Sequence, residues 1–296
     1  MNNGFWGKLA RPIVGLSPMD GVTDAPMRFI SKKYGQPDVI YTEFVSVEGL
    51  WRIHKRGETT SKIWRDLRFD PSEKPVVAQL FGSDPDSFYE ATKIVAKMGF
   101  DGIDINMGCP SPGLEKRGGG AGLMRDFGLA HRVIEAVRKG VDDCFLDSNL
   151  AKCSAHAYLS RPDEVGTRMD MLCADLVGPS APISTRSLIV GDGDLEAKVS
   201  LDPFDGGLIG RAAIGNHCAL RKDGYLPNVE EKLRVAVEHA REFEKNLPGN
   251  KFEPMRKHLT WYAHGFDGAG GLRRKLVQTN SADEVEEVVE NFRKNC

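Results

Sequence analysis

The sequence lacks the features of a membrane protein, of a secreted protein and of a low-complexity chain. Uncharged stretches such as residues 12–19 fall far short of the ~18 apolar residues that a membrane span needs, and no signal-peptide-like segment follows Lys8 and Arg11. With 32 glycines and 16 prolines among 296 residues, the composition is not that of a disordered or collagen-like chain. We therefore expect a folded cytoplasmic protein that does not bind a membrane.

The chain also has little cysteine and no strong excess of either charge. Its six cysteines are scattered, and none belongs to a C-x-x-C pair or to a Cys/His spacing typical of zinc. This pattern predicts free thiols in a reducing compartment and no bound metal. The formal net charge of −2 argues against indiscriminate binding of nucleic acid, but it does not exclude a local basic patch.

Short apolar runs alternate with amphipathic stretches over roughly the first 200 residues, and helical spacing is clear at 86–98 and 129–139. This alternation predicts a parallel sheet covered by helices. The number of runs suits a (β/α)8 barrel of the TIM type, which commonly needs about 250 residues. An open doubly wound sheet is less favoured, because no glycine-rich dinucleotide fingerprint follows the first run. The strand candidates are residues 13–16, 39–42, 76–81, 103–106, 188–190 and 207–210.

From about residue 228 the pattern contains helices only. Ser281 and Glu284 have the spacing of a capping box at the start of the last helix. We expect a barrel domain over 1–225 and a small helical domain over 226–296. The barrel is predicted to be incomplete around its fifth to seventh strands, because residues 141–187 show no clear period and are too few for every outer helix. The predicted helices are 229–245, 253–263, 271–279 and 282–293.

Unusual residues follow several of the strand candidates. Residues 17–24 follow the first strand, 79–82 end the third, and 106–110 follow the fourth. Two glycine-containing segments, Gly191-Asp192-Gly193 and Gly210-Arg211, follow the last two strands. The carboxyl ends of barrel strands carry the active site, so these segments are the first candidates for chemistry.

Together these motifs resemble those of the tRNA-dihydrouridine synthases, flavin enzymes that reduce uridines of tRNA with a reduced nicotinamide cofactor. The resemblance covers residues 12–138, including the blocks at 42–46 and 118–123, and resumes over 228–292. It implies bound FMN, NADPH or NADH as electron donor, and tRNA as partner. We expect a monomer.

Cys109 is the candidate catalytic residue. A lone cysteine is usually a small buried hydrophobe, but Cys109 lies between Gly108 and Pro110 on a loop after a strand. The resemblance implies that it is the general acid, giving a proton to C5 of uracil while the flavin N5 delivers hydride to C6. A free thiol is mostly protonated at neutral pH and suits this role. Asn106 is implied to bind the edge of uracil, and the alternative is a strand-end asparagine that caps a turn.

For the flavin ring, the resemblance implies that Pro18 and Met19 lie against the isoalloxazine and that Gln79 hydrogen-bonds its polar edge. Thr23 or Asp24 can equally be an ordinary N-cap of a helix over 25–33.

For the FMN phosphate, Gly191, Asp192, Gly193, Gly210 and Arg211 are the candidates, because glycine amides, a helix N-terminus and arginine bind phosphate well. A pair of tight turns is the alternative.

The middle of the chain departs from the family pattern. The family's Lys-Thr-Arg and His-Gly-Arg runs after the fifth and sixth strands are absent. Lys152 takes the place of the flavin-contacting lysine only through an irregular alignment. We therefore also consider a non-catalytic RNA-binding remnant of the family, and an FMN oxidoreductase that acts on a small pyrimidine.

The local charge of the helical domain predicts the RNA contact. Between residues 251 and 275 there are six Lys or Arg against two acidic residues, with Trp261 and Tyr262 between them. Such a segment can bind phosphates and stack on exposed bases. A solvated helix face with core aromatic residues is the alternative. The predicted RNA-binding residues are Arg256, Lys257, Arg273, Arg274 and Lys275.

Overall fold

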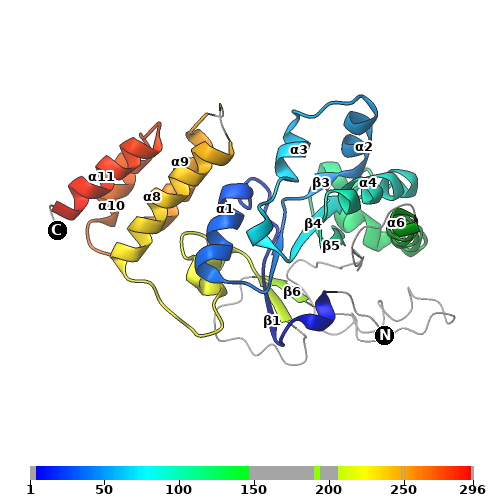
Figure 1. Cartoon of the computed structure of the whole chain (residues 1–296), viewed down its shortest axis with the longest axis horizontal. Helices are drawn as coiled ribbons and strands as arrows, with labels where there is room; N and C mark the ends of the chain where they lie inside the picture. Colours follow the sequence, from blue (N-terminus) through cyan, green and yellow to red (C-terminus); the bar gives the residue numbers. More distant parts are fainter. Residues whose placement is uncertain (1–4, 147–189, 194–205, 248, 250, 295–296) are drawn as a thin grey trace.

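The computed structural model of the chain describes residues 5–146, 190–193, 206–247, 249 and 251–294. Figure 1 shows two parts: a sheet with its surrounding helices, and a group of helices formed by the C-terminal residues. Lys152 and most of the segment 141–187 lie outside the described residues.

All described strands run parallel. In the order of the sheet, β6 pairs with β7, β7 with β1, β1 with β2, β2 with β4, and β4 with both β3 and β5. Among the described strands the last therefore pairs with the first, as in the wall of a barrel, while β5 and β6 are not paired with each other. The strands are β1 (Ile13–Leu16), β2 (Val39–Tyr41), β3 (Val45–Ser46), β4 (Val76–Phe81), β5 (Gly102–Ile105), β6 (Val190–Gly193) and β7 (Gly206–Ile209).

The predicted parallel α/β arrangement is confirmed, with local differences. Strands β1 and β4 have the predicted bounds, whereas β6 includes Gly191, Asp192 and Gly193, which were expected to follow the strand as a loop. The short strand β3 was not predicted. It continues the direction of β2, because β2 pairs with the first two residues of β4 and β3 with its last two.

The sheet is buried because helices cover it. Strand β1 is buried at every position, as expected for a parallel sheet with both faces covered. The main core joins β4 and β5 to α2, α4 and α6, and α4 packs closely on α6. The helices of this part are α1 (Ala25–Ile30), α2 (Val47–Lys55), α3 (Lys62–Asp66), α4 (Pro85–Lys97), α5 (Pro112–Glu115) and α6 (Phe127–Leu146).

The helix after β1 begins where capping chemistry predicts. Asp24 is its N-cap, and the Asp24 carboxylate accepts a hydrogen bond from the backbone N–H of Met27 (2.9 Å). The α-helix ends at Ile30 rather than at the predicted residue 33, and a π-helical turn, η2 (Ser31–Gly35), follows it. The N-cap interpretation of Asp24 is therefore confirmed.

Four helices form the C-terminal part with a core of their own. They are α8 (Val229–Asn246), α9 (Glu253–Tyr262), α10 (Ala269–Leu276) and α11 (Ala282–Lys294), close to the predicted ranges. Their core also includes Ile30 of α1, which packs on α8, so the two parts share an apolar contact. At the start of α11, Ser281 caps the N–H of Glu284 as predicted, but the Glu284 carboxylate accepts from Asn280 rather than from Ser281.

Candidate active site

The loop after β1 lies against the loop after β7. The N–H of Ser17 donates to the carbonyl of Ile209 (3.0 Å), so the backbone remains paired with β7 one residue beyond the end of β1. A Cβ atom placed on Gly210 would lie 3.5 Å from Cβ of Ser17 and 3.6 Å from Sδ of Met19. Pro18, Met19 and Gly210 are thus brought together at the carboxyl end of the sheet.

The two glycine-containing segments that were predicted to bind the phosphate also lie next to each other. Gly193 is the last residue of β6 and pairs in register with Ile209, so it lies next to the residue that precedes Gly210. Arg211 is exposed and begins the short 3-10 helix η5 (Arg211–Ala213) directly after Gly210. This edge presents main-chain groups of two strand ends and a cation together, which suits a phosphate.

A chain of buried amides connects β4 to the cysteine loop. Gln79 donates from Nε2 to Oδ2 of Asp104 (2.5 Å) and accepts from Nδ2 of Asn106 at its Oε1 (3.1 Å). Oδ1 of Asn106 accepts the N–H groups of Gly108 (3.2 Å) and Cys109 (3.0 Å). Gln79 and Asn106 are both buried, while Cys109 is partly exposed.

These contacts bear on the role of Asn106. Its carbonyl oxygen holds the turn that carries Cys109, which is the geometry of the turn-capping alternative. One hydrogen of its amide nitrogen remains for another acceptor. The structure therefore places Asn106 where it orients Cys109, and its contact with uracil stays a prediction.

The loop that faces Cys109 depends on glycine. Gly120 has φ of +57°, and a Cβ atom there would lie 2.7 Å from the carbonyl oxygen of Cys109. The N–H of the next residue, Ala121, donates to that same carbonyl (3.1 Å). A side chain at position 120 would force this loop away from Cys109.

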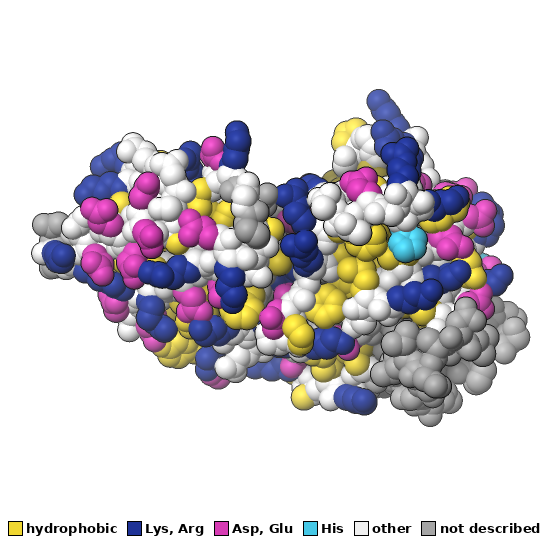
Figure 2. Space-filling model, turned by 45° about the horizontal axis from the view of Figure 1, so that its top comes forward, with side chains coloured by type: hydrophobic (Ala, Val, Ile, Leu, Met, Phe, Trp, Pro, Cys, Tyr) yellow, Lys and Arg dark blue, Asp and Glu magenta, His cyan; other side chains and the backbone are white. Residues whose placement is uncertain are grey.

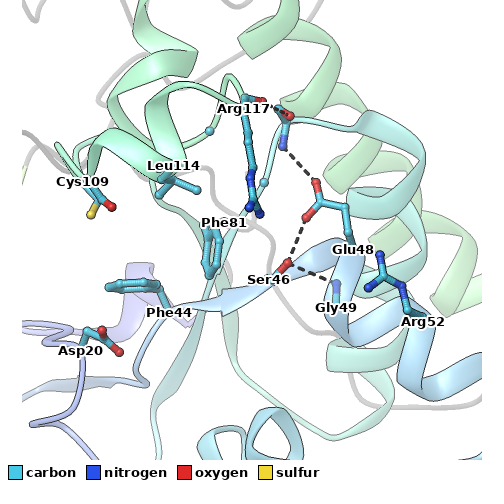
Figure 3. A pocket seen from close by; sticks show the side chains of 15 residues that line it. Asp20, Phe44, Ser46, Glu48, Gly49, Arg52, Phe81, Cys109, Leu114 and Arg117 are labelled. Carbon is cyan, nitrogen blue, oxygen red and sulfur yellow. Dashed lines mark hydrogen bonds between the residues drawn. The ribbon is translucent and has the colours of Figure 1, made fainter.

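Cys109 lines a cavity of about 820 Å³. Figure 3 shows Cys109 and Asp20 at one side of it, Arg52 at the other, and the rings of Phe44 and Phe81 between them. These rings meet edge to face with centroids 5.3 Å apart. The cavity thus brings the thiol of Cys109 together with an aromatic surface and with the guanidinium groups of Arg52 and Arg117.

Two acidic groups on the segments that follow β1 and β2 have altered pKa values. Burial of its carboxyl group raises the pKa of Asp24 to about 7, against a lowering effect of the Met27 N–H. Burial also raises the pKa of Glu43, although Lys62 Nζ lies 3.3 Å from its Oε2 and favours the ionised form. Sequence reasoning did not single out Glu43, Phe44, Arg52 or Arg117. Glu43 and Phe44 belong to the block at 42–46 that carries the family resemblance, and that block could have identified them as site residues.

The predicted RNA-binding residues fall into two groups. Arg273, Arg274 and Lys275 are exposed on α10. Arg256 instead donates to the carbonyl of Thr279 (2.9 Å) and to Asn280, and Lys257 donates to the carbonyl of Gly21 in the loop after β1.

The predicted stacking role of Tyr262 is wrong. Tyr262 is buried, and its hydroxyl group contacts Nε2 of His217 and Nδ1 of His239. It belongs to the core, as the alternative interpretation stated.

A parallel α/β barrel wall with a thiol-lined cavity at the carboxyl ends of its strands defines a barrel enzyme with its site in the usual place. The chain belongs to the dihydrouridine synthase family, whose sequence profile matches residues 15–145 and 191–296. The family has the TIM-barrel fold and catalyses an FMN-dependent reduction, so the predicted fold class and the resemblance are confirmed.

Individual relatives cover nearly the whole chain. A protein of Staphylococcus aureus (strain MRSA252) named "Probable tRNA-dihydrouridine synthase" is 29% identical, with 99% of this chain and 96% of the relative covered. "Probable tRNA-dihydrouridine synthase 2" of Bacillus subtilis (strain 168) is also 29% identical, with 99% and 97% covered.

The chain differs most from its family between residues 145 and 191. The alignment with the Staphylococcus aureus protein extends over 321 positions, more than the 296 residues of this chain, so the relative contains residues that this chain lacks. The family match is interrupted between residues 145 and 191. This interruption includes most of the segment 141–187, where the sequence departs from the family pattern.

In the described residues, no helix is long and apolar enough to cross a membrane. The same part of the chain contains no group of three or more His, Cys, Asp or Glu residues that could hold a metal ion.

Proposed function

We propose that this chain reduces uridine to 5,6-dihydrouridine in tRNA, with FMN as cofactor and NADPH or NADH as electron donor. The observation that carries the proposal is the position of Cys109, which the Gln79–Asn106 amide chain holds at the wall of the cavity. Family membership supports the reaction class.

In this proposal Cys109 is the acid. Reduction of uracil adds hydride at C6 and a proton at C5, so a donor must stand on the face of the base opposite the hydride source. The thiol of Cys109 gives its proton to C5, and the resulting thiolate regains a proton from water. Cys109 is partly exposed, so solvent can restore that proton between turnovers.

The residues around β1, β4 and β7 fit a bound flavin. Pro18 and Met19 would lie against the ring, and Gln79 would meet its polar edge through the second hydrogen of Nε2, which Asp104 does not accept. The main chain of Gly193 and Gly210 with Arg211 would hold the phosphate. Gly191 and Asp192 lie within β6 and support that edge rather than forming a loop. FMN, when bound, supplies the hydride that it has received from the nicotinamide. Lys152, the candidate flavin lysine, lies outside the described residues.

The helical part supplies the RNA contact. We assign phosphate contacts to Arg273, Arg274 and Lys275, which are exposed on one short helix. Arg256 instead stabilises the helical part through its hydrogen bond to Thr279, and Lys257 connects that part to the loop after β1.

The first test is the visible absorption spectrum of the purified chain, followed by nucleoside analysis of tRNA that lacks dihydrouridine. We expect bound flavin and formation of dihydrouridine when NADPH or NADH is present. Reduction of free uracil but not of tRNA would favour a small-pyrimidine reductase. Salt-sensitive tRNA binding by a chain that holds no flavin would instead identify a non-catalytic remnant.

A further inference from the structure

The cavity beside Cys109 extends well beyond the thiol. Its volume of about 820 Å³ lies near the upper end of pockets that hold drug-sized ligands, which measure about 300–1,000 Å³. A single uracil ring placed against Cys109 leaves the part toward α2 open. That part is available to a second group of the substrate.

The open part has an aromatic floor. Phe44 precedes β3 and Phe81 ends β4, and both line the cavity and are partly exposed. Their edge-to-face contact fixes both rings in one arrangement. An exposed, rigid aromatic surface beside a nucleotide site is suited to stacking with a base.

Two arginines border the same part. Arg52 projects from α2, and Arg117 extends from the segment after α5 toward Phe81 (Figure 3). Both are exposed, and within the described residues neither has an acidic partner. Glu48 also lines the cavity, but its carboxylate oxygens accept from the hydroxyl of Ser46 (3.0 Å) and the N–H of Ser83 (3.3 Å). The wall therefore offers two uncommitted guanidinium groups to an anion.

The positive charge continues outside the cavity on the same two segments. Arg56 follows α2 and Lys116 precedes Arg117, and both are exposed. Figure 2 shows Lys and Arg side chains at several places around an exposed hydrophobic area on this face of the molecule. Exposed cations on both segments, in addition to the two that line the cavity, suit a polyanion better than a ligand with one phosphate group.

We propose that this part of the cavity is a subsite for a nucleotide adjacent to the reactive uridine: its base stacks on Phe44 and Phe81, and Arg52 and Arg117 bind the neighbouring phosphates. The subsite rests on the proposed function, because it assumes an RNA substrate. It places the RNA chain across the cavity, between the exposed cations of α10 and those of α2.

The test uses the holoenzyme with the variants Arg52→Gln, Arg117→Gln, the double variant and Phe44→Leu. Arg138→Gln is the matched control, since Arg138 is an exposed arginine on α6 that does not line the cavity. Dissociation constants for tRNA are measured at several salt concentrations. Rates of flavin reduction by NADPH and of dihydrouridine formation are measured in parallel, with flavin content as the check on folding.

Each arginine variant is expected to weaken tRNA binding about fourfold near 0.15 M salt and to reduce the slope of log Kd against log salt by about 0.7. Phe44→Leu is expected to weaken binding roughly tenfold with no change in that slope. Flavin reduction by NADPH and all properties of Arg138→Gln should be unchanged.

Other outcomes are informative in different ways. If the arginine variants raise the KM for NADPH and leave tRNA binding unchanged, the phosphate belongs to the dinucleotide and the subsite is refuted. If the wild-type protein binds tRNA and forms dihydrouridine, and the arginine and Phe44 variants bind tRNA equally well, the subsite is refuted while the proposed function stands. A wild-type chain that neither binds tRNA nor forms dihydrouridine would refute the proposed function together with the subsite.

Discussion

Oδ1 of Asn106 lies 3.0 Å from the backbone nitrogen of Cys109 and accepts its hydrogen bond. The same oxygen accepts from Gly108, while the amide nitrogen of Asn106 donates to Gln79. The cysteine that we propose as the acid is therefore oriented by a buried amide network that begins on the neighbouring strand β4 and not by its own loop alone.

The first prediction concerns this network. Asn106→Ala removes three hydrogen bonds and leaves buried partners unpaired, so we expect a loss of about 1–3 kcal/mol in the free energy of unfolding. Displacement of the acid should also lower the rate of dihydrouridine formation by roughly 10². Denaturant unfolding and single-turnover kinetics measure the two effects. Full stability with lost activity would show that Asn106 acts on the substrate and not on the turn.

Replacement of the proposed acid itself gives a second prediction. Cys109→Ala removes the proton donor and leaves the backbone contacts of Asn106 and Ala121 in place. We expect flavin reduction by NADPH to be unchanged and dihydrouridine formation to fall by about 10²–10⁴. Rapid-mixing measurement of each half-reaction separates the two. An unchanged rate of tRNA reduction by Cys109→Ala would refute the assignment.

A buried ion pair supports the loop after β1 and carries the third prediction. Nε of Arg28 lies 2.8 Å from Oε2 of Glu73, and both side chains are almost completely buried. Arg28 also donates to the carbonyl of Thr23 (2.9 Å). Glu73→Ala leaves the guanidinium buried without its counter-charge, so we expect a loss of about 3–5 kcal/mol. Thermal unfolding checks this, with the exposed Glu135→Ala on α6 as control.

The sequence predicts the elements with strong local signals. Strand β1 is a continuous apolar run, β4 is apolar except for Gln79, and the four C-terminal helices have clear periodicity, so their positions agree with expectation. Strand β3 has only two residues, too few to show any period. Its position is set by pairing with the end of β4, which is a tertiary contact.

The site residues also divide into those with a local sequence signal and those that only the tertiary fold brings together. Cys109 was identified from its position on a loop after a strand and from the family resemblance, and Gln79 from that resemblance. Arg52 and Arg117 were missed because one lies on a helix and the other on a surface loop, and only the fold brings them to one cavity. The error on Tyr262 has a geometric cause: successive helical residues point about 100° apart, so Trp261 and Tyr262 cannot both face the same partner.

Asp24 gives a prediction of pH dependence. Burial raises its pKa in the folded chain to about 7, above the value of 3.8 of a free side chain, so the folded state binds the proton more tightly. The stabilising contribution of the protonated group is complete below about pH 4 and is lost as the pH rises to about 7. Asp24→Asn keeps an N-cap without this titration. We expect its stability relative to wild type to rise between pH 4 and 7, as measured by denaturant unfolding at several pH values. A constant difference would contradict this assignment.

The final prediction concerns the buried contact between the two parts of the chain. His217 joins Ser31 of the barrel (2.8 Å) to Tyr262 of α9, and His239 contacts the same hydroxyl (3.0 Å). Burial lowers the pKa of His217 to about 3, so the folded state binds its proton less tightly than the unfolded state does. The stability that neutral His217 contributes is therefore present above about pH 6.5 and is lost as the pH falls toward 3.

Tyr262→Phe tests this contact directly, because it removes the hydroxyl that the two imidazoles share. We expect a loss of about 1–3 kcal/mol at pH 7.5, since the buried imidazole nitrogens lose a partner. In this variant the contact between the barrel and the C-terminal helices should open more readily than the rest of the protein. Hydrogen exchange should then be faster in α8 and α9 than in α4 and α6. Arg241→Gln on the exposed face of α8 should show neither effect. A Tyr262→Phe protein with wild-type stability and wild-type exchange would mean that apolar packing alone, and not the shared hydroxyl, holds the helical part on the barrel.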